Sequence, residues 1–201
     1  MREEHLTDGA PAGVALPAEL EGYREQFEAV KRDASELVVG LSDAQFNWRP
    51  AAGAWSIAEC LAHLNVTGQF FLPRIDRHIR EARAAGMLSE GPFRYGLLSR
   101  VMVRGTEPPA KLKFKAPKIF QPMSEHLSAV IVPAFMTLQD QLVERLRAAR
   151  GVDLRRVKVT SPVSRLVKIS LGQVFPFVAA HERRHLCQAR RVREDANLPV
   201  A

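Results

Sequence analysis

Apolar residues recur along the first forty positions of the chain with the period of an α-helix. Their spacing alternates between four and three residues: Leu16, Leu20, Tyr23, Phe27, Val30, Ala34, Leu37 and Leu41. This spacing puts all of them on one face of a helix, which is then expected to be buried. Pro17 suits the first turn and Gly40 suits the C-terminal end. The pattern therefore predicts an amphipathic helix between these two residues.

A second apolar stripe follows a loop at residues 47–55, which proline and glycine interrupt. The stripe begins after Ser56-Ile57-Ala58-Glu59, which has the form of a capping box with Ser56 as the N-cap. Its members at helical spacing are Ile57, Leu61, Leu64, Gly68, Phe71, Ile75 and Ile79. We expect a second long helix here, bent near Pro73. A shorter capping box at Ser42–Gln45 predicts a brief helical turn before the loop.

Two more long helices are expected in the C-terminal half. The third would begin with Ser124 as its cap and end near Gly151, with Pro133 as a source of a kink. Its apolar stripe comprises Leu127, Ile131, Ala134, Leu138 and Leu142. The fourth begins at a capping box, Ser170-Leu171-Gly172-Gln173, and runs toward Asn197 despite one proline, Pro176.

Residues 86–121 show weak periodicity and recurrent glycine and proline, and only Gly96–Val103 suggests a short helix. The remainder is expected to be a long crossover connection, to which we assign no chemistry. Four long helices with one long connection predict an all-α four-helix bundle. Because no repeat or boundary interrupts the pattern, we expect an N-terminal tail at 1–17 and a single domain at 18–198.

Charge is distributed unevenly over the 201 residues, whose net charge is +7. Residues 1–90 carry 9 Lys and Arg against 14 Asp and Glu, whereas residues 91–201 carry 20 against 8. A basic half can attract nucleic acid or anionic metabolites. No nucleic-acid-binding motif accompanies the charge, so a solvated basic surface is the favoured interpretation and nucleic acid ranks last among the partners.

The cysteine content and the hydropathy pattern bear on the compartment. Cys60 and Cys187 are the only two cysteines, which argues against a disulfide framework and favours a reducing cytoplasm. No apolar run approaches the ~20 residues of a membrane span, and the N-terminus lacks the apolar core of a signal peptide. We expect a cytoplasmic protein without a membrane partner.

Two histidines are the candidate chemistry of the fourth helix. Its predicted buried stripe consists of Val174, Val178, His181, His185, Gln188 and Val192. His181 and His185 would therefore lie one turn apart on the apolar face. Burying two imidazoles is costly unless their nitrogens are satisfied, which a metal ion does directly. The spacing also arises by chance, so the pair alone leaves a metal site and two hydrogen-bonded core histidines equally open.

A third protein ligand would have to come from another part of the chain. His5 lies in the tail, and His126 lies near the start of the third long helix. On the second helix, His63 points about 120° from the centre of the apolar stripe, at its flank. His78 points closer to the stripe but lies about 22 Å further along that helix. Spacing alone leaves His63 and His78 as close rivals.

Two sequence motifs bear on this choice. Residues 47–65, Asn-Trp-Arg-Pro-Ala-Ala-Gly-Ala-Trp-Ser-Ile-Ala-Glu-Cys-Leu-Ala-His-Leu-Asn, combine Trp-Ser-hydrophobic with a helix that carries a histidine followed by leucine. Later, Ser170 opens a helix that carries His181-Glu-Arg-Arg-His185-Leu-Cys-Gln188. In this order, the pair resembles the DinB-like family of bacterial proteins over about residues 18–198. The family shares its name with a DNA polymerase but neither its fold nor its activity.

The resemblance implies an up-down-down-up four-helix bundle with a long crossover between the second and third helices. It also implies a divalent metal held by His63, His181 and His185, and so favours His63 over His78. Related enzymes of this superfamily, such as bacillithiol S-transferases and mycothiol-dependent maleylpyruvate isomerase, use the metal to bind and activate a small thiol. Many members have no assigned activity, and dimers are common, so we also expect a homodimer.

Three imidazoles leave a fourth position open, as in catalytic zinc sites. Water or a substrate thiolate could occupy that position. Imidazole ligands suit several metals, among which we expect zinc or nickel. Gln188 and Cys60 are candidates for outer contacts to the ligands, although a small buried hydrophobe is the stronger interpretation of Cys60.

Four further residues near these motifs have a structural interpretation at least as strong as a functional one. Trp48 and Trp55 are candidate walls of a pocket, and packing against the bundle is an equal expectation. Glu182 and Arg184, which flank the histidines, are expected to be interhelical or surface partners.

The leading functional hypothesis is a metal-dependent enzyme that acts on a small thiol or a thiol adduct, as an S-transferase or else as a hydrolase. We assign no catalytic residues to it. The second is a non-catalytic metal-binding stress-response protein, in which the ion only joins two helices. A nucleic-acid-binding protein ranks third because it rests on charge alone.

Overall fold

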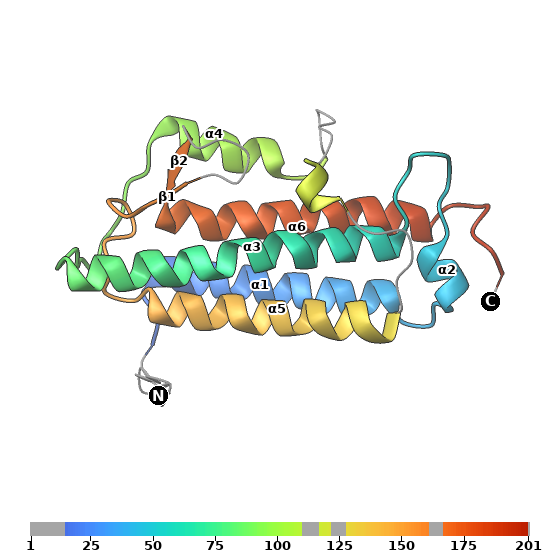
Figure 1. Cartoon of the computed structure of the whole chain (residues 1–201), viewed down its shortest axis with the longest axis horizontal. Helices are drawn as coiled ribbons and strands as arrows, with labels where there is room; N and C mark the ends of the chain where they lie inside the picture. The colour runs from blue at the N-terminus through green and yellow to red at the C-terminus, as the bar shows by residue number, and fades with distance from the viewer. Residues whose placement is uncertain (1–14, 110–116, 122–127, 161–166, 201) are drawn as a thin grey trace.

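The structure is a computed structural model, and it describes residues 15–109, 117–121, 128–160 and 167–200. Within these ranges the chain forms six α-helices, a 3-10 turn and one small hairpin (Figure 1). In chain order these are α1 (Ala18–Val38), α2 (Asp43–Asn47), α3 (Ile57–Ala84), α4 (Leu97–Thr106), the 3-10 turn η1 (Lys118–Phe120), α5 (Ser128–Ala148), β1 (Lys158–Thr160), β2 (Lys168–Ser170) and α6 (Leu171–Arg193). The prediction of a helical bundle is confirmed.

The four long helices pack side by side, and α4 covers part of their outer surface (Figure 1). Both α1 and α3 pack against α5 and against α6, while α4 lies on α6. Each long helix therefore touches two long neighbours, and its buried surface is wider than the single stripe that the spacing of apolar residues suggested. None of the described helices has the length and apolarity needed to cross a membrane.

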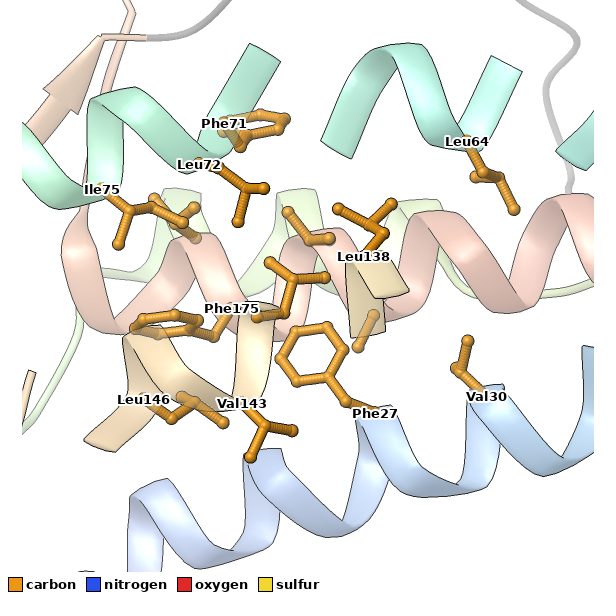
Figure 2. Close-up of a cluster of buried hydrophobic side chains, with 14 of the residues drawn as sticks. Phe27, Val30, Leu64, Phe71, Leu72, Ile75, Leu138, Val143, Leu146 and Phe175 are labelled. Atoms are coloured by element: carbon orange, nitrogen blue, oxygen red, sulfur yellow. The ribbon is translucent and has the colours of Figure 1, made fainter. Parts of the chain in front are cut away.

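Apolar side chains from all four long helices fill the space between them (Figure 2). Phe27 and Val30 of α1, Phe71 and Ile75 of α3, Leu138 of α5 and Phe175 of α6 belong to this core. Gly68 also belongs to the predicted stripe, and because it has no side chain it lets α5 come close to α3. A Cβ built at Gly68 would lie 2.3 Å from Leu138 Cδ2, so a larger residue would force the two helices apart.

Two of the three predicted capping boxes are present. In α2, the Gln45 amide donates to Ser42 Oγ at 3.3 Å, and the Ser42 amide donates to Gln45 Oε1 at 3.0 Å. In α3, the Glu59 amide donates to Ser56 Oγ at 3.1 Å, and the Ser56 amide donates to Glu59 Oε2 at 2.9 Å. These caps fix where both helices begin.

The third predicted capping box, at Ser170, is wrong. Ser170 ends the hairpin strand β2, which pairs antiparallel with β1, and its hydroxyl donates to the carbonyl of Arg155 at 3.0 Å. The first amides of α6 are satisfied by backbone instead: those of Leu171 and Gly172 donate to the carbonyls of Val157 and Leu154. The hairpin, with strands of three residues each, was not predicted because such short strands leave no measurable alternation.

Other predicted boundaries differ by a few residues, as is usual at helix ends. The helix α1 begins at Ala18, two residues after Leu16, and α6 ends at Arg193 rather than near Asn197. The predicted short helix at Gly96–Val103 corresponds to α4. The predicted cap Ser124, together with His5 and His126, lies outside the described residues.

Candidate metal centre

Three histidines from two helices come together where α3 packs against α6, with His63 buried and His181 and His185 half-buried. His63 lies in the second turn of α3, and His181 and His185 lie one turn apart in the middle of α6. One ligating nitrogen from each ring lies within 4.8 Å of the other two. The ring centroids are 4.6 to 5.1 Å apart. Among the described residues this is the one group of three or more potential ligands that could hold a metal ion.

The burial of His63 differs from what its wheel position indicated. The angle from the apolar stripe argued against burial, yet only 3% of this residue is exposed. The reason is that α3 packs on α6 as well as on α5, so its flank faces a second helix rather than solvent. Its rival His78 lies near the other end of α3, where its Nδ1 lies 3.1 Å from the carboxylate of Glu81.

Hydrogen bonds orient the imidazole of His63. Its Nδ1 lies 2.7 Å from the carbonyl oxygen of Phe120, in η1. A carbonyl can only accept, so Nδ1 carries the hydrogen and Nε2 presents a lone pair. That Nε2 lies 3.3 Å from Nε2 of His181.

The predicted outer partner Gln188 lies beside His185. The Oε1 atom of Gln188 is 3.2 Å from Nδ1 of His185. An amide oxygen accepts a hydrogen bond, so this contact also leaves Nε2 of the ring with its lone pair free. Two of the three rings thus hold their Nδ1 hydrogen outward, away from the cluster.

Burial keeps the three rings neutral. Burial lowers the pKa of His63 despite its hydrogen bond to Phe120, and it lowers the pKa of His185 to about 3. The pKa of His181 falls well below its ordinary value, first because of burial and then because of the neighbouring His185 and His63. Neutral imidazoles are the form that binds metal.

The donor set fits a small divalent cation. A tetrahedral ion with metal–nitrogen bonds of about 2.0–2.1 Å separates its ligand nitrogens by about 3.3–3.4 Å. The 3.3 Å between the Nε2 atoms of His63 and His181 agrees with this edge. In the metal-free protein a hydrogen on Nε2 of His181 can bridge this pair, and a cation bound between the two nitrogens would take the place of that hydrogen.

Two aromatic rings cover the cluster. Trp55 lies with its ring centroid 4.9 Å from that of His63 and stacks on His185 at 5.5 Å. Phe177 stacks on His181, with centroids 6.3 Å apart and planes within 8°. Sequence reasoning missed Phe177, although it lies four residues before His181 and therefore on the same face.

The other two candidates lie elsewhere. Trp48 packs against the hydrophobic core as a half-buried residue. Cys60 is fully buried in that core, and burial raises the pKa of its thiol above the ordinary range. A thiol that stays protonated behaves as a small hydrophobic group.

The loop that carries Trp55 is attached to the start of α3. Arg49 donates from Nε to Glu59 Oε2 at 2.8 Å, and its Nη2 contacts the other oxygen of the same carboxylate. Because Glu59 also accepts from the Ser56 amide, one buried carboxylate joins the cap of α3 to the loop. This arrangement fixes Trp55 relative to His63.

The residues between the two histidines of α6 contact other helices. Glu182 is 1% exposed, and its Oε1 accepts from Gln139 of α5 at 3.0 Å. Burial raises the pKa of Glu182 to about 8. Arg183 pairs with Glu107, at the end of α4, and its Nη1 donates to Gln26 of α1. The expectation that Glu182 is an interhelical partner is therefore correct.

Comparison with known proteins places the chain in a family. The family model of the DinB superfamily matches residues 26–189. The chain is also 25% identical over 169 residues to the uncharacterized protein YuaE of Bacillus subtilis (strain 168), a match that covers 84% of this chain and 95% of YuaE. No solved structure gave a significant match. With the family model covering most of its length, the chain belongs to the DinB superfamily.

Proposed function

We propose that the protein is a metal-dependent enzyme in which His63, His181 and His185 hold one divalent ion, zinc or nickel. The observation that carries the proposal is the pair of Nε2 atoms 3.3 Å apart, of which that of His63 presents its lone pair toward that of His181. Three protein ligands leave the fourth position of a tetrahedral ion for a substrate or water.

The proposed substrate class is a small thiol or a thiol adduct, and the proposed reaction is an S-transfer. When bound, a divalent ion supplies a Lewis acid that favours the thiolate over the thiol. The protein's own part is to hold the Nδ1 hydrogens of His63 and His185 outward through Phe120 and Gln188. Trp55 and Phe177 pack against the rings of His185 and His181.

The proposal includes an up-down-down-up order of the four long helices. It is supported by the course of the chain in Figure 1, where α1 and α6 run in one direction and α3 and α5 in the other. In that order the ligand-bearing helices α3 and α6 are antiparallel neighbours.

The direct test is the metal content of the native protein and of single variants. We expect one equivalent of metal per chain in the wild type and none in His63→Ala or His185→Ala. His78→Ala is the matched control, because it removes a histidine from the same helix outside the cluster, and it should retain the metal. Stoichiometric metal in both ligand variants would contradict the site.

A second experiment tests the substrate class. Small thiols are added to the protein loaded with cobalt in place of the native ion. Binding of a thiolate to the open position should change the absorption spectrum of the cobalt. Spectra that do not respond to any thiol would contradict the thiol proposal while leaving the metal site in place.

The alternative is a metal-binding stress-response protein without catalysis. It is supported by the origin of the ligands in two helices, α3 and α6, which an ion would join. It predicts a large loss of stability on chelation and a cobalt spectrum that thiols leave unchanged.

A further inference from the structure

We propose that Phe120 is a positioning residue for the metal centre: its buried ring holds η1 against α3, so that its own carbonyl keeps His63 in the tautomer with a bare Nε2. The inference rests on the proposed metal site, but the tautomer of His63 is a property of the metal-free protein. It can therefore be tested separately.

Two histidines of the cluster have a hydrogen-bond partner at Nδ1, and the two partners come from different parts of the chain. His185 has its partner, Gln188, three residues away on the same helix. His63 has its partner 57 residues further along the chain, in the connection between α3 and α5. The orientation of His63 is therefore only as well defined as the position of that short turn.

The side chain of Phe120 supplies the attachment of η1 to α3. Its residue is 4% exposed, and its ring meets the ring of Phe70 edge to face, with centroids 5.3 Å apart and planes at 90°. Phe70 is itself held by Arg74, whose guanidinium lies 3.3 Å from the centroid of the Phe70 ring. Within the turn, the Phe120 amide donates to the carbonyl of Pro117 at 2.9 Å.

Phe120 thus contacts one helix at two places. Its carbonyl meets His63, and its ring meets Phe70, seven residues or about 10 Å further along α3. Two contacts separated along a helix define the orientation of the turn, which one contact alone does not. The neighbouring Ile119 is 67% exposed and takes no part in this packing.

Without the ring of Phe120, its carbonyl should no longer be held beside Nδ1 of His63. His63 should then lose its preference for the tautomer with hydrogen on Nδ1. Outer partners of this kind typically change metal affinity 10- to 100-fold when they are removed. We therefore expect Phe120→Ala to raise the dissociation constant for zinc about 10- to 100-fold. Ile119→Ala, a truncation in the same turn, should leave it within about twofold of the wild type.

The experiment measures two quantities in each full-length variant. The tautomer of His63 is read from its ring nitrogen-15 shifts in the metal-free protein, and the zinc dissociation constant is read by competition with a chromophoric chelator. The wild type and Ile119→Ala should show hydrogen on Nδ1, and Phe120→Ala should show a mixture of tautomers. Phe120→Leu, which keeps a buried apolar side chain, should fall between them.

An unchanged tautomer and an unchanged zinc affinity in Phe120→Ala would overturn the proposal, as would an equal effect of Ile119→Ala. If Phe120→Ala does not fold, Phe70→Leu removes the same ring contact from a half-buried position and carries the same two predictions. If the wild type binds no zinc, the proposed function fails, and the tautomer measurement still decides whether Phe120 positions His63.

Discussion

The chemistry of the cluster depends on how each histidine nitrogen is used. His63 and His185 each have an acceptor at Nδ1, and burial keeps all three rings neutral. The three side chains therefore offer nitrogen ligands at neutral pH without first losing a proton. The same burial should lower the stability of the metal-free protein at acidic pH.

Without metal, the protein should lose stability as the pH falls below about 6.5. The pKa values of the three histidines are lower in the folded state than in the unfolded state. Just below pH 6.5 the unfolded chain therefore binds more protons at these histidines than the folded chain does. Between pH 6.5 and 5, a fully shifted histidine costs up to about 2 kcal/mol. Urea unfolding at both pH values measures this loss, which should be smaller in His185→Ala. An equal loss in that variant would contradict the assignment.

Glu182 should act in the opposite direction. Its folded-state pKa is raised to about 8, so its contribution is complete below about pH 4.5 and is lost as the pH rises through 8. The free energy of unfolding of Glu182→Gln should exceed that of the wild type by roughly 5 kcal/mol at pH 9 and by only about 1 kcal/mol at pH 5, as measured by urea unfolding. A difference that does not depend on pH would show that Glu182 is not protonated in the folded protein.

At the scale of single elements, the first turn of α3 both begins the helix and holds the loop that carries Trp55. Its capping box contains Glu59, which also holds Arg49 and so the loop with Trp55. An interaction that first specifies a helix start therefore also places an aromatic ring over two of the histidines.

Arg49→Ala should destabilise the protein by about 1 kcal/mol, since it leaves the buried carboxylate of Glu59 without its cationic partner while Arg49 itself is half-exposed. It should also change the tryptophan emission, to which Trp48 and Trp55 both contribute. Arg24→Ala is the control, because it breaks the ion pair with Glu21 on the surface of α1 and should have less effect. The comparison is made by urea unfolding with tryptophan emission as the signal.

Sequence patterns predicted the helices and their caps well wherever local interactions alone determine them. The stripes of α1 and α3 and the caps at Ser42 and Ser56 follow from local spacing. The cap at Ser170 could not be predicted in the same way, because the hairpin competes for its hydroxyl. The burial of His63 depends on a second neighbouring helix, and its contact with Phe120 joins residues 57 apart. Neither has a local signal.

At the scale of the whole molecule, the proposed ion would join two helices that are far apart in sequence. Residues 63 and 181 bring α3 and α6 into one site, and a ligand that binds only the folded state stabilises it by mass action. Zinc at 100 times its dissociation constant should therefore add about 2.7 kcal/mol to the unfolding free energy.

This stabilisation is measured as a zinc-dependent rise in the melting temperature. It should be absent in His63→Ala and retained in His78→Ala, whose side chain lies outside the cluster. A rise of the same size in His63→Ala would mean that zinc binds elsewhere.

The most direct test of the central claim is a titration of the metal-free protein with cobalt, followed by visible absorption. We predict that the wild type saturates at one equivalent, with the intense absorption bands of a four-coordinate ion, and that His63→Ala shows no such bands. A wild-type protein that binds no cobalt, or a His63→Ala variant with the wild-type spectrum and stoichiometry, would contradict the three-histidine site.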